Sequence, residues 1–265
     1  MLFWIYDYST ELMAVLFTLS FAAVSIVGLM LFRGLCHRWL HRDPRVNEMV
    51  GFSMASFSML YGLLLGLLAV AAYQGFSATS DLVAKEASIL SALYRVSGAL
   101  PEPAGSELQG QLRDYTREVI DRSWPAQRQG IVPAGASPLV AAFLDRLYRF
   151  EPATMREQTV QAEAMTLANE MVQVRQSRLL GVDGGIPPVL WWVVLAGAFV
   201  NVFLMWMLDM ARRTHVILTS LVGGFLGLVI FLVAAMDYPF RGEVSVSADA
   251  FEAVYRTLMV PASGR

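Results

Sequence analysis

The sequence predicts an all-α membrane protein with four transmembrane helices and a helical bundle inserted between the second and third. Four apolar runs contain no charged residue and no histidine, and each reaches the length of about 20 residues that crosses a bilayer. These runs are Leu12–Phe32, Met49–Tyr73, Ile186–Leu208 and Val216–Met236. The long gap between the second and third runs shows helical periodicity and no alternating strand pattern, which favours a helical insertion.

The first apolar run is interpreted as a retained helix and not as a cleaved signal peptide. Asp7 and Glu11 precede it, where a signal peptide would carry positive charge. The run is also longer than the apolar core of a signal peptide. The chain is therefore expected to keep all four spans.

The second apolar run is expected to continue outward as one long helix, because apolar residues recur at helical spacing until Pro101. Its membrane half carries a stripe of small residues. One interpretation is close helix packing, with Gly223 and Gly227 of the fourth run as the partner face. The other is that the helix lines a pore between subunits. The candidate pore-lining residues are Ser53, Ser56, Ser58, Tyr61, Gly62 and Gly66.

The insertion is expected to form several helices joined by loops rich in proline and glycine. An amphipathic helix covers about 106–123, and Pro125 is expected to end it. Thr154 and Glu157 have the spacing of a capping box, which predicts a helix from there to about Leu180. The predicted organisation is a membrane pair in 1–75, an extramembrane bundle in 76–186, a second membrane pair in 187–240, and a C-terminal segment with a short amphipathic helix in 241–265.

Composition and motifs argue against catalysis and against nucleic-acid binding. The chain is 56% hydrophobic and 16% charged, with a formal net charge of −2 and no basic stripe. It contains no phosphate-binding glycine loop, nucleophile elbow or HExxH motif, so we expect neither an enzyme nor a cofactor. One cysteine and three histidines in the short loops are consistent with either a metal site or a basic patch facing anionic lipid head groups. The residues concerned are Cys36, His37, His41 and His215.

A few polar residues within or next to the spans are candidates for contacts between helices or for a pore mouth. Asn201 is the one amide in the third run and is expected to make a polar contact with another helix. Glu86, Asp237 and Arg241 follow the outer ends of the second and fourth runs. One interpretation is a structural ion pair of Arg241 with either Asp237 or Glu86. The other is a charged ring at a pore mouth that selects ions.

The short loops predict the orientation of the chain. The segment 33–48 and the hairpin 209–215 together carry six arginines: Arg33, Arg38, Arg42, Arg45, Arg212 and Arg213. The positive-inside rule places these loops in the cytoplasm. The insertion and both termini are then expected outside the cytoplasm, which is the periplasm for a bacterial inner-membrane protein.

Several segments resemble the bacterial bestrophin-like proteins and, more distantly, the bestrophin ion channels. They are NEMVGFSMASFSMLYGLLLGLLAV at 47–70, KEASILSALYRV at 85–96, the pair Trp124-Pro125, and DYPFRGEVSVSADAF at 237–251. The likeness covers nearly the whole chain, and the segment DYPFRG is its most specific part. It implies a homopentameric channel with four membrane segments per subunit and a pore lined by the second segment, here 53–66.

Two features depart from the bestrophin pattern. Bestrophins keep the insertion in the cytosol, whereas the charge bias here places it outside. The acidic calcium-binding cluster of the eukaryotic members has no clear counterpart in this sequence.

The functional hypothesis is an oligomeric ion channel whose partners are the lipid bilayer, further copies of the chain and inorganic ions. The alternative is a membrane sensor or scaffold whose outer bundle binds a ligand or a partner protein. A sensor would need a separate partner on the arginine-rich loops, because the cytoplasmic side offers only short segments.

Overall fold

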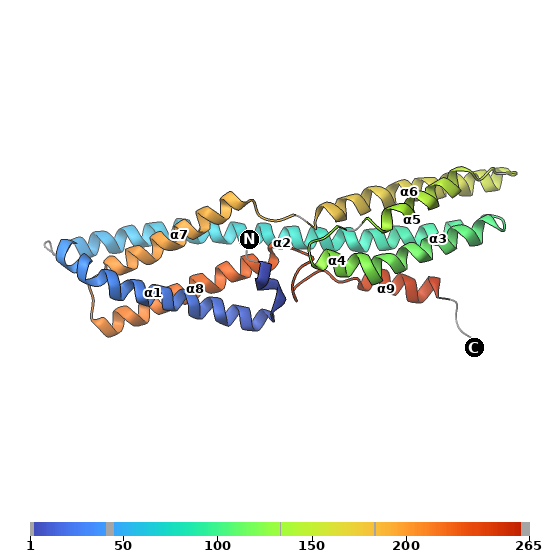
Figure 1. The fold of residues 1–265 in the computed structure, drawn as a ribbon. Helices are drawn as coiled ribbons and strands as arrows, with labels where there is room; N and C mark the ends of the chain where they lie inside the picture. Colours follow the sequence, from blue (N-terminus) through green and yellow to red (C-terminus); the bar gives the residue numbers. More distant parts are fainter. Residues whose placement is uncertain (1–2, 41–44, 133, 183, 261–265) are drawn as a thin grey trace. The chain divides into compact units, whose positions relative to one another are not determined.

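The computed structural model describes residues 3–40, 45–132, 134–182 and 184–260, without the side chains of 3 and 37–40. Every regular element within these ranges is helical, as Figure 1 shows. The α-helices are α1 (Thr10–Leu40), α2 (Val46–Ser97), α3 (Ala104–Glu118), α4 (Trp124–Arg128), α5 (Ala136–Tyr148), α6 (Met155–Leu180), α7 (Pro188–Met207), α8 (Arg212–Asp237) and α9 (Asp249–Val254). A 3₁₀ helix (Phe3–Asp7) and two π-helical turns (Val119–Ser123 and Tyr255–Met259) complete the set.

Four of the helices are long and apolar enough to cross a membrane, namely α1, α2, α7 and α8. The expected all-α fold class with four spans is therefore confirmed. The second span is one continuous helix of 52 residues, which at 1.5 Å per residue is about 78 Å long. A bilayer core is only about 30 Å thick, so much of α2 lies beyond the membrane, as its periodicity predicts.

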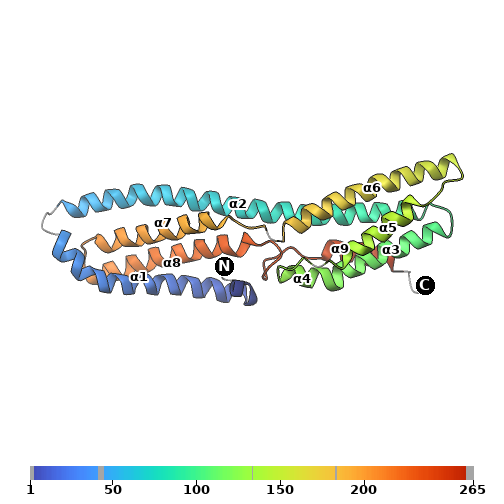
Figure 2. The same ribbon diagram turned by 45° about the horizontal axis from the view of Figure 1, so that its top comes forward.

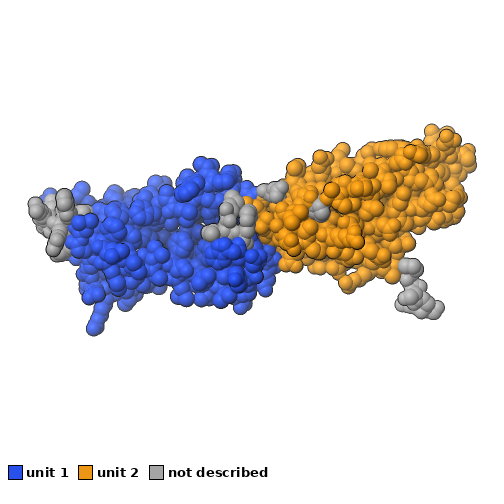
Figure 3. Space-filling model, viewed as in Figure 1, with its two compact units in different colours: residues 1–75, 185–237, 242–244 blue, residues 76–184, 238–241, 245–265 orange. Residues whose placement is uncertain are grey.

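The chain divides into two compact units, which are coloured separately in Figure 3. The membrane unit comprises 1–75, 185–237 and 242–244. The bundle unit comprises 76–184, 238–241 and 245–265. Each unit has a hydrophobic core of its own, and α2 contributes residues to both cores.

In the membrane unit, α1 lies along α8, and the two helices run side by side in Figure 2. The small residues of α8 make this contact. A Cβ atom added to Gly227 would lie 2.7 Å from the Phe17 carbonyl oxygen, and one added to Gly223 would lie 2.3 Å from Ser25 Oγ. The expected pairing of these glycines with the second span was wrong, because α1 occupies the space in front of them.

The N-terminal segment is tied to the end of α8 in the same unit. The Tyr6 hydroxyl donates to the carbonyl oxygen of Ala234 at 2.7 Å. The backbone N–H of Thr10, the first residue of α1, donates to Glu243 Oε2 at 2.8 Å. This carboxylate satisfies one of the open amides at the helix start, and the bond holds the pKa of Glu243 below its ordinary value.

In the bundle unit, α3, α5 and α6 pack with the outer part of α2 around a core of leucine, valine and aromatic side chains. The capping box at the start of α6 forms as expected. Thr154 Oγ1 accepts from the Glu157 N–H at 3.2 Å, and Glu157 Oε2 accepts from the Ala153 N–H at 2.8 Å. Both bonds satisfy amides at the N-terminal end of the helix.

Pro125 does not end the preceding helix, contrary to expectation. A π-helical turn follows α3, and the Trp124 N–H bonds to the carbonyl oxygen of Val119 five residues back. The widened turn accommodates the proline ring at the start of α4, where no N–H is needed. The helical path therefore continues to Arg128.

Candidate functional site

The membrane part of α2 has one face that contacts α7. The Tyr61 hydroxyl donates to the carbonyl oxygen of Val194 at 2.8 Å, and Ser58 Oγ donates to Asn201 Oδ1 at 3.1 Å. Tyr61 and Asn201 are both buried, with 4% of each exposed. Two of the candidate pore-lining residues, Ser58 and Tyr61, thus face the interior of the membrane unit, where Asn201 provides a polar partner for Ser58.

A further contact fixes the start of α2. The Asn47 side chain makes two hydrogen bonds with the backbone of Asp209 in the loop between α7 and α8. Its Nδ2 donates to the Asp209 carbonyl oxygen at 3.2 Å, and its Oδ1 accepts from the Asp209 N–H at 2.9 Å. Asn47, Ser58 and Tyr61 share one face of a 3.6-residue helix. These contacts at both ends of the face set the rotation of α2 about its axis.

The opposite face of α2 points away from the other helices of the unit. It carries Phe52, Ser56, Met59 and Leu63, which recur at the spacing of one helical face. Phe52 is 76% exposed, Met59 is 79% exposed and Leu63 is 63% exposed. The candidates predicted from the sequence are small or polar residues and do not include Met59 and Leu63. Their spacing of three and seven residues from Ser56 is the signal that would have found them.

The remaining candidate pore-lining residues, which are serines and glycines, are on the surface of the membrane unit. Ser53, Ser56, Gly62 and Gly66 are all exposed. A Cβ atom added to Gly62 or Gly66 would find nothing within 4 Å, whereas one added to Gly197 of α7 would lie 2.3 Å from the Tyr61 ring. The glycines of α2 are therefore not used for packing within the subunit.

The exposed faces of the other spans have a different composition. Those of α1 and α8 carry large apolar side chains that suit lipid, such as Leu19, Val24, Leu31, Leu221 and Phe225. The exposed side of α2 instead mixes apolar residues with hydroxyl groups and glycines. Hydroxyls and open backbone on a membrane helix are typical of faces that meet water or another subunit.

Comparison with known proteins identifies the family of this chain. The family model described as the Bestrophin-like domain matches residues 13–251. The chain belongs to the Bestrophin-like family. The matched residues include α2, α7 and α8, all of α1 except its first three residues, and the bundle unit up to the first half of α9. No curated protein matches the chain.

Solved structures share the fold of this bestrophin-like chain. A point variant of a bacterial bestrophin homologue from Klebsiella pneumoniae has a TM-score of 0.64 at 10% identity, covering 95% of this chain and 99% of that chain. A second variant has a TM-score of 0.63 at 11% identity, with 93% and 96% covered. The homologue phased with zinc has a TM-score of 0.61 at 11% identity, also with 93% and 96% covered.

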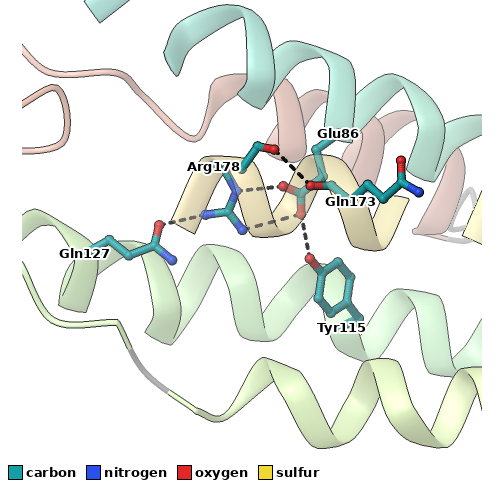
Figure 4. Close-up of polar contacts among 6 residues, drawn as sticks. Glu86, Tyr115, Gln127, Gln173 and Arg178 are labelled. Atoms are coloured by element: carbon teal, nitrogen blue, oxygen red, sulfur yellow. Dashed lines mark hydrogen bonds and ion pairs between the residues drawn. The ribbon is translucent and has the colours of Figure 1, made fainter. Parts of the chain in front are cut away.

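The bestrophin-like bundle unit buries the first of the charged candidates. Glu86 has no exposed surface and is paired with Arg178 of α6, which is 1% exposed. Arg178 Nε donates to Glu86 Oε2 at 2.7 Å, and the Tyr115 hydroxyl donates to Glu86 Oε1 at 2.6 Å. Arg178 Nη1 donates to Gln127 Oε1 at 2.7 Å. Figure 4 shows how these side chains from α2, α3, α4 and α6 converge.

Aromatic rings enclose the same guanidinium group. The Arg178 Cζ atom lies 5.4 Å from the ring centroid of Trp124 and 5.6 Å from that of Phe251 in α9. Burial lowers the pKa of Arg178, and the Glu86 carboxylate more than offsets this, so the pKa lies above its ordinary value. Burial and the same carboxylate raise the pKa of the Tyr115 hydroxyl. This charge cluster is a closed internal network and not an open ion site.

Glu86 is among the residues predicted from the sequence, whereas its partner Arg178 is not. The available signal was the position of Arg178 at helical spacing from the buried residues Met171 and Val174 of α6. An arginine on the apolar face of an amphipathic helix indicates a buried partner of opposite charge.

The other charged candidates have different surroundings. In the membrane unit, Asp237 at the end of α8 accepts from the Ile186 N–H at 2.5 Å and from Trp191 Nε1 at 3.2 Å. These bonds join the end of α8 to the start of α7. In the bundle unit, the Arg241 guanidinium lies over the Tyr238 ring, with its Cζ atom 5.6 Å from the centroid. The roles of Asp237 and Arg241 at a pore mouth stay predictions.

The metal-ligand candidates do not form a recognisable centre in the described part of the chain. Cys36 is buried, and His215 Nε2 is 2.9 Å from the carbonyl oxygen of Met205. The side chain of His37 and all of His41 lie outside the described residues. Among the residues described, no group of three or more His, Cys, Asp or Glu side chains could hold a metal ion.

Proposed function

We propose that this chain is one subunit of a homo-oligomeric ion channel in which α2 lines a central pore. The observation that carries the proposal is the division of α2 into two faces. Asn47, Ser58 and Tyr61 hold one face against the subunit's own α7 and the loop after it, whereas the opposite face is left open and carries Ser56. Gly62 and Gly66, which lie between these two faces, are also uncovered.

Symmetry explains why such a face suits a pore. In a ring of identical subunits, each α2 presents the same face to the axis. The hydroxyls of Ser53 and Ser56 can replace part of an ion's hydration shell, while Met59 and Leu63 form rings of apolar side chains. Apolar rings of this kind gate by excluding water. The family membership supports the channel, and the resemblance to bestrophins favours a pentamer.

Two serines on opposite faces of α2 provide a matched test. In a Cys36→Ala background, which removes the single cysteine, Ser56→Cys and Ser58→Cys are reconstituted into liposomes and treated with a charged thiol reagent. We expect ion flux through the Ser56→Cys protein to fall several-fold, because the reagent reaches the pore. Flux through the Ser58→Cys protein is expected to stay unchanged, because Ser58 faces Asn201.

Two results would contradict the proposal. If the wild-type protein conducts no ions in either direction at any voltage or pH, it is not a channel. If the reagent blocks Ser58→Cys as strongly as Ser56→Cys, the protein is a channel but this face of α2 does not line its pore.

We also propose that the bundle lies outside the cytoplasm, as the six arginines of the short loops favour. The test uses the same cysteine-free background with single cysteines at two exposed positions, Gln158→Cys in α6 and Thr214→Cys in α8. In intact cells, an impermeant maleimide is expected to label the first and to spare the second until the inner membrane is opened. The reverse pattern would place the bundle in the cytosol.

One observation favours the sensor as a second candidate. The bundle unit has an open groove of about 480 Å³, lined by Val96, Ala99, Thr159, Val160, Ala162, Glu163 and Thr166. A groove of this size falls within the range of small-molecule sites. Filling it with Ala162→Trp is expected to abolish any ligand response of a sensor, whereas the ion flux of a channel lined by α2 would persist.

A further inference from the structure

The segments at the two ends of the membrane-spanning helices differ strongly in charge. One end comprises the segments 33–48 and 208–215, which carry six arginines against three acidic residues, Asp43, Glu48 and Asp209. The residues that enter the membrane from the other end, 1–12 and 185–192, contain Asp7 and Glu11 and no basic residue. The basic residues at the first end are all arginines, because the one lysine of the chain is Lys85.

The structure holds the loop between α7 and α8 rigidly at this basic end. The Asn47 side chain makes two hydrogen bonds with the backbone of Asp209. The half-buried side chain of Arg33 in α1 donates through Nη2 to the carbonyl oxygen of Met210 at 3.2 Å. The loop is thus held by α1 on one side and by α2 on the other, and the first turn of α8 follows it directly.

The next two residues present their charges outward. Arg212 and Arg213 form the start of α8 and are exposed, as is Arg45 before the start of α2. Arg33, Arg45, Arg212 and Arg213 are together called the arginine platform. Val216, one turn after Arg212, begins the apolar run of the span, so the charged groups lie at the depth of the lipid phosphates.

We propose that the arginine platform binds the phosphate head groups of anionic phospholipids in the adjoining leaflet. A guanidinium group offers two parallel N–H donors that match two oxygens of one phosphate, and it stays charged at every physiological pH. The membrane surface attracts basic juxtamembrane residues additively. The hydrogen-bonded loop fixes the backbone from which the two exposed arginines of α8 extend, which lowers the backbone part of the ordering cost of binding. The inference is independent of ion conduction.

The experiment measures lipid retention by the full-length protein. Protein in mild detergent is mixed with phosphatidylglycerol or phosphatidylcholine, and retained lipid is counted by native mass spectrometry. We expect preferential retention of phosphatidylglycerol. Arg212→Gln/Arg213→Gln is expected to weaken that retention by roughly thirty-fold, since each surface arginine contributes about a factor of five. Arg212→Lys/Arg213→Lys keeps the charge and is expected to recover most, but not all, of the affinity.

A matched pair of substitutions controls for net charge. Arg122→Gln/Arg156→Gln removes two exposed arginines from the bundle unit and is expected to leave retention unchanged. The proposal is overturned if phosphatidylcholine is retained equally, if the Arg212/Arg213 variant retains lipid like the wild type, or if the bundle variant loses as much. Displacement of the lipid by millimolar inorganic phosphate would also overturn it, because the site would then take free phosphate.

Discussion

Substitution of Arg178 by alanine tests whether the buried charge cluster holds the bundle unit together. The change leaves the Glu86 carboxylate without surface exposure and with the Tyr115 hydroxyl as its remaining donor in the cluster. It also removes the cation between Trp124 and Phe251. Removing one partner of a buried ion pair lowers the free energy of unfolding by about 3–5 kcal/mol. That is a large part of the about 5–15 kcal/mol that holds a typical domain folded.

The assay is chemical unfolding of the full-length protein in mild detergent, followed by far-ultraviolet circular dichroism and tryptophan fluorescence. Trp124, whose ring adjoins Arg178, is one of the six tryptophans that contribute to this fluorescence. An exposed pair serves as the control. Lys85 and Glu170 lie 2.9 Å apart with side chains that are 55% and 41% exposed, and Lys85→Ala is expected to cost at most about 1 kcal/mol.

A second variant separates the charge from the packing. In Glu86→Gln/Arg178→Met both charges are replaced by neutral groups of similar size, so no buried carboxylate is left unpaired. This variant is expected to be more stable than Arg178→Ala. The reasoning would be refuted if Arg178→Ala cost no more than Lys85→Ala, or if the double variant were no more stable than the single one.

Further predictions concern pH, helix packing and the pore. Tyr115→Phe is expected to cost about 1.5–3 kcal/mol at pH 8, because it removes a hydrogen bond to a charged acceptor. The folded state raises the pKa of Tyr115. The free energy of unfolding of the wild type should therefore fall as the pH rises above the unfolded tyrosine pKa of about 10. Chemical unfolding at a series of pH values should show a smaller fall for Tyr115→Phe. Gly227→Ala should destabilise the membrane unit by about 1–3 kcal/mol through overpacking, whereas Gly66→Ala should leave thermal stability unchanged and alter the oligomer on size-exclusion chromatography. Leu63→Ala should raise single-channel conductance by widening an apolar ring, whereas the buried Leu65→Ala should lower stability by about 2–5 kcal/mol without that gain.

The outline of the fold was predictable because its signals are local. The length and hydropathy of four runs identify the spans, and the three-to-four-residue spacing beyond Tyr73 identifies α2 as one helix to Ser97. The capping box at Thr154 likewise depends on neighbours within one turn. The effect of Pro125 was not predictable, because the π-helical turn before it removes the need for its N–H.

The candidate site was predictable only in part. The sequence analysis selected α2, and the structure places Ser53, Ser56, Gly62 and Gly66 on its exposed side. The hydroxyl groups and glycines of the membrane part of α2 occur on several of its sides, so composition does not reveal the rotation of the helix, and Ser58 was grouped with Ser56 although the two face opposite ways. The missing information was the position of Asn201, a hydrogen-bond partner in a distant span.

Residue types at short spacing were enough to predict the number of membrane spans, the long second helix, the helical insertion and the family. Tertiary structure alone decided which helices meet. It placed Gly223 and Gly227 against α1, turned Ser56 outward, and paired Glu86 with an arginine 92 residues away in sequence. The physical reason is that periodicity assigns a residue to a helix face, whereas its partner is chosen by three-dimensional packing and by the cost of leaving a buried polar group unpaired.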